Sequence, residues 1–182
     1  MNIILIQARL NSSRLPSKVL LKIGNKTIVD IINSRLKGIK NVNKIIFAIP
    51  NDSKNKKLQN YLKSKNLNTF SGSANNVLDR FYKVAKKEKA KNIIRLTADC
   101  PFMDKNLINR MIKLFSLKNY DYLSNTINPS FPDGLDVEIF KFSLLKKIWK
   151  KAKTNFDKEH VTPLMLKQFD IKKFNYKNKK DQ

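Results

Sequence analysis

The sequence is poor in the residues that usually build metal centres and disulfides. Of its 182 residues, one is a cysteine, Cys100, and one is a histidine, His160. A single cysteine cannot form a disulfide within the chain, and a single histidine excludes zinc sites built from several histidines or from His/Cys clusters. Because the absence of an internal disulfide fits a reducing compartment, we expect a cytoplasmic protein.

Long hydrophobic runs are also missing. No apolar stretch approaches the roughly 18 residues that a membrane-spanning helix requires. The apolar residues 3–6 are too short for a signal peptide, and no basic segment precedes them. With 41% hydrophobic residues and a mean hydropathy of -0.46, the composition is that of a globular protein. We expect one domain over residues 1–182 and no membrane partner.

Acidic residues are scarce, since 14 of them stand against 38 basic residues and give a formal net charge of +24 at pH 7. A charge of this size favours nucleic-acid binding in general. Here 32 of the basic residues are lysines, spread along the chain and interleaved with 22 asparagines, and no nucleic-acid-binding motif accompanies them. We interpret most lysines as solvated helix faces and predict no nucleic-acid partner.

Apolar runs and amphipathic stretches alternate along the chain. Short runs of large aliphatic residues are typical of strands buried in a parallel sheet, and apolar residues at i, i+3 and i+4 are typical of helices. The alternation predicts an α/β protein with a mostly parallel sheet flanked by helices, built from right-handed βαβ units. The expected strands are 2–7, 44–49, 68–70, 92–99, 120–125, 135–140 and an edge strand at about 171–175, and the expected helices are about 27–38, 51–65, 75–89, 104–117, 143–152 and 158–168.

The first of three polar clusters is QARLNSSRLPSK, residues 7–18, directly after the first expected strand, where an open α/β sheet binds its ligands. The chain has four glycines and none lies in this segment, so it matches neither the Walker motif nor the dinucleotide-binding motif. Its side chains would therefore bind phosphate; the alternative is a solvated basic loop. The residues concerned are Arg9, Ser12, Ser13, Arg14 and Lys18.

The second cluster, RLTADCP, ends a buried strand on Asp99. A carboxylate there, facing cations on a neighbouring strand, suits Mg²⁺ held between the protein and phosphate groups. The alternative is a helix cap or an ion pair with Arg95. We interpret Cys100 as a small buried residue rather than a nucleophile, because no general base is near it in the sequence.

The third cluster, FPDGLDVEIF, concentrates acids in a chain that has few of them. Asp133 and Asp136 could hydrogen-bond sugar hydroxyls, with Gly134 providing the turn, and the alternative is an ordinary turn before a strand. Farther along, Glu159 and His160 in KEHVTP are as compatible with the start of a helix as with a site.

These clusters, in this order, resemble the sugar-acid cytidylyltransferases, the family of CMP-Kdo and CMP-acylneuraminate synthetases, and within it the spore-coat polysaccharide F-type subgroup. The opening motif of that subgroup is present in full, and later segments are similar too: SGSANNVLDRFYKVA, RLTADCPFMD, FPDGLDVEIF and EHVTP. The likeness runs from residue 1 to about 168. It implies a nucleotide-diphospho-sugar transferase fold of the glycosyltransferase-A kind, with CTP as donor, a small sugar acid as acceptor and Mg²⁺ as cofactor.

The resemblance also implies roles for individual residues. It assigns catalysis to Arg9, Lys18 and Asp99, and it makes Asp99 the metal ligand. The sugar would be held near Asp133 and Asp136. The implied CTP site comprises Ala8, Arg9, Ser12, Ser13, Arg14, Lys18, Ser71, Gly72, Arg80 and Thr97.

The implied reaction is in-line attack of a sugar hydroxyl on the α-phosphorus of CTP with release of pyrophosphate, for cell-surface polysaccharide synthesis. Three alternatives stay open: a glycosyltransferase-like enzyme using a nucleotide-sugar, a nucleotide-binding relative with reduced catalysis, and a non-catalytic basic protein. Relatives continue for several dozen residues past the equivalent of position 168 and carry another metal-binding aspartate there. We therefore expect a C-terminally short domain with an incomplete metal site; a homodimer is compatible with the sequence.

Overall fold

The structure is a computed structural model that describes residues 1–12 and 15–178. Ser13 and Arg14, two residues of the predicted phosphate loop, lie outside this range. The strands of the main sheet are β1 (Asn2–Gln7), β4 (Lys44–Pro50), β5 (Thr69–Gly72), β6 (Asn92–Thr97), β7 (Tyr122–Ser124), β8 (Glu138–Lys141) and β9 (Lys173–Asn175). The α-helices are α1 (Ile28–Leu36), α2 (Lys56–Ser64), α3 (Val77–Lys87), α4 (Lys105–Lys118), α5 (Phe142–Lys151), α6 (Asn155–His160) and α7 (Pro163–Leu166).

The sheet has the strand order β5-β4-β1-β6-β8-β7-β9 within the described residues. Strands β5, β4, β1 and β6 are mutually parallel, β8 runs antiparallel to both β6 and β7, and β9 pairs parallel with β7. The prediction of a mostly parallel sheet flanked by helices is confirmed. Strand β9 forms one edge of the sheet, as the sequence predicted, and its exposed Lys173 discourages pairing with another edge.

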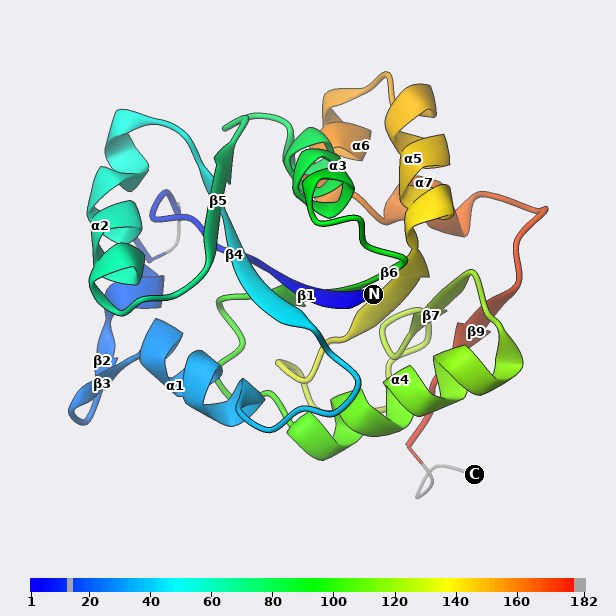
Figure 1. Ribbon diagram of the computed structural model, residues 1–182, viewed down its shortest axis with the longest axis horizontal. Helices are drawn as coiled ribbons and strands as arrows, with labels where there is room; N and C mark the ends of the chain where they lie inside the picture. Colours follow the sequence, from blue (N-terminus) through cyan, green and yellow to red (C-terminus); the bar gives the residue numbers. More distant parts are fainter. Residues whose placement is uncertain (13–14, 179–182) are drawn as a thin grey trace.

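Two helical layers cover the sheet, with α3, α5, α6 and α7 on one side and α1, α2 and α4 on the other (Figure 1). The residues of β1 alternate between the two layers. Ile4 and Ile6 belong to the core cluster that includes α1 and α4, whereas Ile3 and Leu5 belong to the cluster that includes α3 and α5. Both faces of β1 are therefore buried, which explains its continuous run of aliphatic residues.

The topology creates a switch point between β1 and β6. From β1 the chain crosses through α1 to β4 on one side, and β6 is reached through α3 on the opposite face of the sheet. The register pairs Ile6 with Leu96 and Gln7 with Thr97, so the segments that follow β1 and β6 leave the sheet side by side. Open α/β sheets bind ligands at this kind of position.

Most expected elements lie within a few residues of the observed ones, but the helix expected over 158–168 is wrong. The chain forms two short helices there, α6 and α7, separated by Val161 and Thr162. Val161 has φ 66°, which ends α6, and Pro163 opens α7. The segment 51–65 likewise begins with a 3₁₀ turn, η2 (Ser53–Asn55), before α2.

Candidate active site

The surrounding structure anchors the described residues on both sides of the loop after β1, and none of them is a glycine. Leu10 and Val19 are buried, and the Leu10 N–H donates to Asn55 Oδ1 at 2.8 Å. The Ser17 N–H donates to the carbonyl of Leu10 at 2.9 Å, and Ser17 itself adopts φ 57°. These contacts return the chain to the sheet, and Lys18 opens the short helix η1 (Lys18–Leu20) beside β6.

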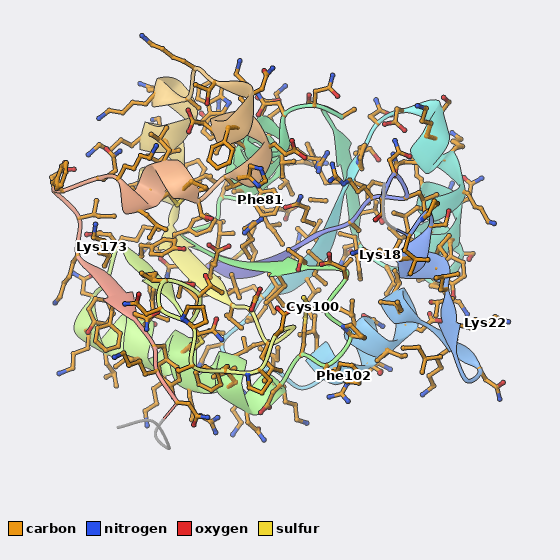
Figure 2. The ribbon with its side chains drawn as sticks, turned by 180° about the vertical axis from the view of Figure 1, so that it is seen from behind. Lys18, Lys22, Phe81, Cys100, Phe102 and Lys173 are labelled. Carbon is orange, nitrogen blue, oxygen red and sulfur yellow. The ribbon has the colours of Figure 1, made fainter. Side chains whose placement is uncertain are left out.

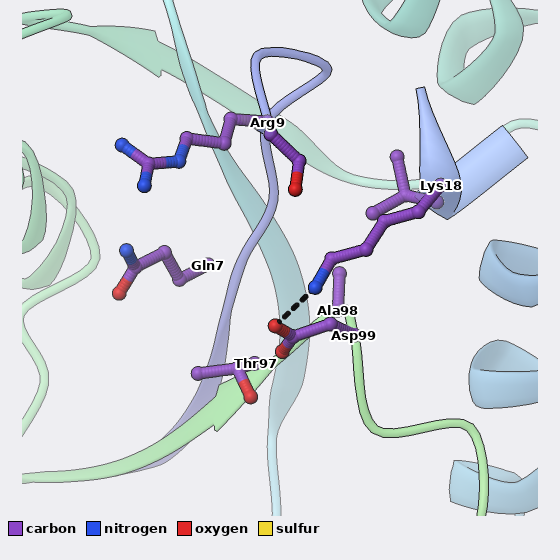
Figure 3. Close-up of a pocket in the computed structure, with 8 residues that line it drawn as sticks. Gln7, Arg9, Lys18, Thr97, Ala98 and Asp99 are labelled. Atoms are coloured by element: carbon purple, nitrogen blue, oxygen red, sulfur yellow. Dashed lines mark hydrogen bonds and ion pairs between the residues drawn. The ribbon is translucent and has the colours of Figure 1, made fainter. Parts of the chain in front are cut away.

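Lys18 and Asp99 meet at the switch point. The Lys18 amino group donates to Asp99 Oδ2 at 2.7 Å, as Figure 3 shows. Burial raises the pKa of the Asp99 carboxyl, but hydrogen bonds from Lys18 and Thr97 outweigh that effect, and its pKa lies below the usual value. The alternative partner considered for Asp99, Arg95, instead pairs with Glu138. Asp99 is therefore an ionised carboxylate at neutral pH.

A first cavity of about 170 Å³ opens over the carboxyl ends of β1 and β6. Gln7, Arg9, Thr97 and Asp99 are drawn around it in Figure 3, and Ser12 and Lys18 complete its polar wall. It therefore combines two cations with hydroxyl and amide donors in a small space, which suits a ligand with several phosphate groups.

A second cavity of about 650 Å³ adjoins the first and shares Ser12, Lys18, Thr97 and Asp99 with it. Figure 2 shows Lys18, Cys100 and Phe102, which all line this cavity, near one another. Its remaining wall is acidic and comes from the loop before β8, with Asp133 and Asp136.

Several carboxylates lie close together at the second cavity, and this raises the pKa of one of them. Burial raises the pKa of Asp136, and the nearby carboxylates of Asp133, Glu138 and Asp99 raise it further. Burial likewise raises the pKa of the Cys100 thiol. Since a thiol of raised pKa is a poor nucleophile at neutral pH, Cys100 is better explained as a packing residue.

A third cavity of about 250 Å³ continues from the second past Thr97 and Asp136. Its floor is the ion pair of Arg95 with Glu138, in which Glu138 also accepts from the Tyr122 hydroxyl at 2.6 Å. Its outer wall is formed by His160, Thr162 and Pro163, from the corner between α6 and α7. The first two polar clusters of the sequence do not predict this wall. The sequence feature that pointed to it was the EHVTP segment.

Most of the predicted residues lie around the first two cavities. Arg9 lines the first cavity, Asp133 and Asp136 line the second, and Ser12, Lys18, Thr97 and Asp99 line both. Ala8 is buried, and its N–H donates to the carbonyl of Ala48 at 3.3 Å, so it supports the loop. Gln7 is a polar residue of the first cavity that the sequence did not predict as a site residue, because it ends the buried strand itself; the apolar Val19 and Ala98 were not predicted either.

Ser71, Gly72 and Arg80 are not among the residues that line these three cavities. They lie at the carboxyl end of β5 and on α3. Arg80 is completely buried, and a Cβ on Gly72 would come within 3.0 Å of Arg80 Cγ. Arg80 Nη1 donates to the carbonyl of Ser73 at 2.7 Å. The arginine thus packs beneath the segment that the sequence assigned to the nucleotide.

The described residues contain no cluster of three or more His, Cys, Asp or Glu side chains arranged to hold a metal. Among the same residues, no helix is both long enough and apolar enough to cross a membrane.

Comparison with known proteins identifies the family of this chain. The family described as Cytidylyltransferase matches residues 3–180. This chain belongs to the cytidylyltransferase family. It is 37% identical over 172 residues to the uncharacterized protein MJ1063 of Methanocaldococcus jannaschii, covering 94% of this chain and 70% of that protein. It is 34% identical over 163 residues to the spore coat polysaccharide biosynthesis protein SpsF of Bacillus subtilis, covering 87% of this chain and 67% of SpsF.

Solved cytidylyltransferase structures share the fold. The structure of a cytidylyltransferase from Leptospira borgpetersenii superposes with a TM-score of 0.92 at 32% identity, over 98% of this chain and 76% of the other. The structure of CMP:2-keto-3-deoxy-manno-octonic acid synthetase complexed with CTP superposes with a TM-score of 0.74 at 15% identity, over 97% and 90% of the two chains. At that identity the second likeness shows the fold alone.

Proposed function

We propose that this cytidylyltransferase moves CMP from CTP onto a hydroxyl of a Kdo- or acylneuraminate-like sugar acid and releases pyrophosphate. The first cavity carries the proposal, because Arg9, Lys18 and Asp99 line it at the switch point of the family's sheet. The names of SpsF and of the CMP-2-keto-3-deoxy-manno-octonic acid synthetase support the acceptor class and a role in cell-surface polysaccharide synthesis. We also propose a cytoplasmic location, since one free cysteine suits a reducing compartment.

In the proposed reaction the acceptor hydroxyl oxygen bonds to the α-phosphorus of CTP while the bond from that phosphorus to the β-phosphate oxygen breaks. Pyrophosphate keeps the electron pair, and the hydroxyl proton passes to a carboxylate of the second cavity or to water. Arg9 and Lys18 would stabilise the charge that develops on the leaving pyrophosphate. Lys18 must exchange Asp99 for a phosphate oxygen, and because that ion pair is partly exposed, the exchange costs little.

The acceptor would lie in the second and third cavities. Asp133 and Asp136 can accept hydrogen bonds from sugar hydroxyls, and the Arg95 guanidinium lines the third cavity, where it can face a carboxylate. Holding the hydroxyl in line with the scissile bond would supply much of the rate acceleration.

The residues present fit the proposed cofactor Mg²⁺. This ion usually takes one or two protein carboxylates and fills its remaining positions with phosphate oxygens and water. Asp99 is ionised and borders both the first and the second cavity, so it can supply the protein ligand. When bound, Mg²⁺ neutralises phosphate charge and so assists departure of pyrophosphate.

Nucleotide-dependent stabilisation tests the donor. CTP with Mg²⁺ should raise the melting temperature more than ATP or GTP does, because a ligand that binds only the native state stabilises it in proportion to RT ln(1 + [L]/Kd). Equal shifts with all nucleotides would indicate phosphate binding without base selection, and a larger shift with a nucleotide-sugar would favour a glycosyltransferase-like enzyme. The absence of any shift would contradict the proposal.

Pyrophosphate release with Kdo, acylneuraminate and related sugar acids tests the reaction. Arg9→Ala and Lys18→Ala should each lower turnover by about 10² to 10³ while the protein stays folded, since each removes a charge-assisted contact made in the transition state. Arg110→Ala is the control, because Arg110 is exposed on α4. If all three variants behaved alike, the loop would be a solvated basic segment. CTP binding without turnover of any sugar acid would favour a nucleotide-binding relative with reduced catalysis.

A further inference from the structure

The corner between α6 and α7 has an unusual backbone. Val161 has φ 66° and ψ −57°, and the Thr162 N–H donates to the carbonyl of His160 at 2.7 Å. These values describe a γ-turn of the rare, strained kind with positive φ. A β-branched residue in this region is an outlier, and such strain persists where the surrounding structure enforces it, often at functional sites.

Packing on both sides enforces the turn. Val161 is completely buried in the core cluster that also contains Met165 of α7. At the start of α6, Thr154 Oγ1 donates to Asp157 Oδ2 at 2.7 Å, and the Asp157 N–H donates back to Thr154 Oγ1 at 3.1 Å. Helix α6 also packs against α3. The backbone on both sides of Val161 is therefore held in place.

The side chains that flank Val161 point to the cavities of the candidate active site. Glu159 Oε1 accepts a hydrogen bond from Arg9 Nη1 at 3.2 Å, although the two residues are 150 positions apart in the chain. His160 and Thr162, directly before and directly after Val161, line the third cavity. Glu159 therefore contacts the loop after β1, whereas His160 and Thr162 lie at the third cavity, where the acceptor is proposed to bind.

The ion pair between Arg9 and Glu159 is better suited to orient the Arg9 side chain than to stabilise the fold. Arg9 is 49% exposed and Glu159 is 47% exposed, and ion pairs at that exposure contribute little to folding. The contact uses Arg9 Nη1, so Nε and Nη2, which have no partner among the described residues, can still reach a ligand. Burial lowers the pKa of Arg80, and repulsion between Arg80 and Arg9 lowers it further. Glu159 places a negative charge beside the Arg9 side chain that Arg80 repels.

We propose that Glu159 is a positioning residue: it holds the Arg9 guanidinium at the first cavity, and the strained turn at Val161 fixes Glu159 there. The inference rests on the proposed function, in which Arg9 contacts the triphosphate. A free arginine side chain must be ordered when its ligand binds, which weakens binding, whereas a side chain held in place beforehand avoids that loss.

The test is a double-mutant cycle on CTP binding in the presence of Mg²⁺, measured by calorimetry. Glu159→Gln should weaken CTP binding about three- to tenfold and leave the melting temperature within about 2 °C of wild type, since an exposed pair adds little stability. In an Arg9→Ala background the same substitution should have no further effect. The KM for CTP should rise more than kcat falls. Asp170→Asn is the matched control, because it breaks another exposed ion pair, with Lys147, and neither residue lines any of the three cavities.

Unchanged or tighter binding by Glu159→Gln would overturn the inference, because Glu159 would then be a bystander or a competitor of the triphosphate. Equal weakening in the Arg9→Ala background would also overturn it, since Glu159 would act without Arg9. Failure of the wild-type protein to bind CTP is a separate result, and it would overturn the proposed function together with this inference.

Discussion

Arg80 is a positive charge in a position with no exposed surface. Its Nε and Nη2 atoms are buried and have no hydrogen-bond partner among the described residues. Burial lowers the pKa of Arg80 to about 10, repulsion from Arg9 lowers it as well, and attraction to Asp52 opposes both. A buried charge so poorly compensated destabilises a fold. The presence of Arg80 beneath the segment 71–76 is better explained by a contribution to ligand binding than by a contribution to the stability of the fold.

Arg80→Met should therefore separate stability from binding. Met fills a similar volume without a charge, so the melting temperature should stay the same or rise by a few degrees. CTP affinity should fall about tenfold, which corresponds to about 1.4 kcal/mol, because the positive field beside Arg9 is lost. Thermal melting and calorimetry on the same samples measure both quantities, with Arg110→Met as the exposed control. A large drop in melting temperature would instead make Arg80 a structural residue.

At the scale of single residues, the contacts that follow from strand order could be predicted from the sequence. Asp99 and Lys18 each follow a buried strand, and parallel neighbours bring such residues to one edge of the sheet, so their proximity was foreseeable. The burial of Arg80 was not foreseeable, because an arginine on an amphipathic helix is normally exposed. Glu159 was equally hidden, since its partner lies 150 residues away.

At the scale of elements, the corner at Val161 departs most from expectation. Its apolar spacing predicted one helix over 158–168, and no glycine marks the break that separates α6 from α7. The break arises from burial: Val161 occupies the core with a conformation that the local sequence disfavours. Tertiary packing overrides local preference here, whereas the strands 2–7, 44–50 and 92–97 were predictable because burial and local preference agree.

The strain at Val161 predicts an inverted order of stability for two substitutions. Val161→Ala and Val161→Gly both remove the buried side chain, but alanine keeps the penalty for positive φ, and glycine does not. The glycine variant should be more stable than the alanine variant by about 1 kcal/mol. Urea denaturation measures the difference.

Val84 provides the matched control, because it is buried in the middle of α3 with ordinary helical geometry. There the order should be the usual one, with Val84→Gly less stable than Val84→Ala by about 1 kcal/mol. If glycine were the less stable variant at both positions, the turn at Val161 would carry no strain, and the fixed position of Glu159 would need another explanation.

For the whole molecule, the formal charge of +24 acts differently on folding and on binding. The lysines are spread over the surface; Figure 2 shows Lys22 and Lys173 at opposite sides of the molecule. Such a distribution repels itself in the folded state. The cations of the first cavity, Arg9 and Lys18, are the exception, because they converge on one small space.

Salt should therefore move stability and affinity in opposite directions. Raising NaCl from about 20 mM to about 300 mM shortens the Debye length from more than 20 Å to less than 10 Å and screens the repulsion among the dispersed lysines. The melting temperature of the ligand-free protein should rise, whereas the affinity for CTP should fall several-fold, because the same screening weakens attraction between the first cavity and the triphosphate. Sucrose at matched osmolality is the control for non-ionic effects on stability. A melting temperature that fell with salt would show that specific ion pairs such as Lys44–Glu88 outweigh the net repulsion, and the lysines would then have to be treated as structural partners rather than as a solvated surface.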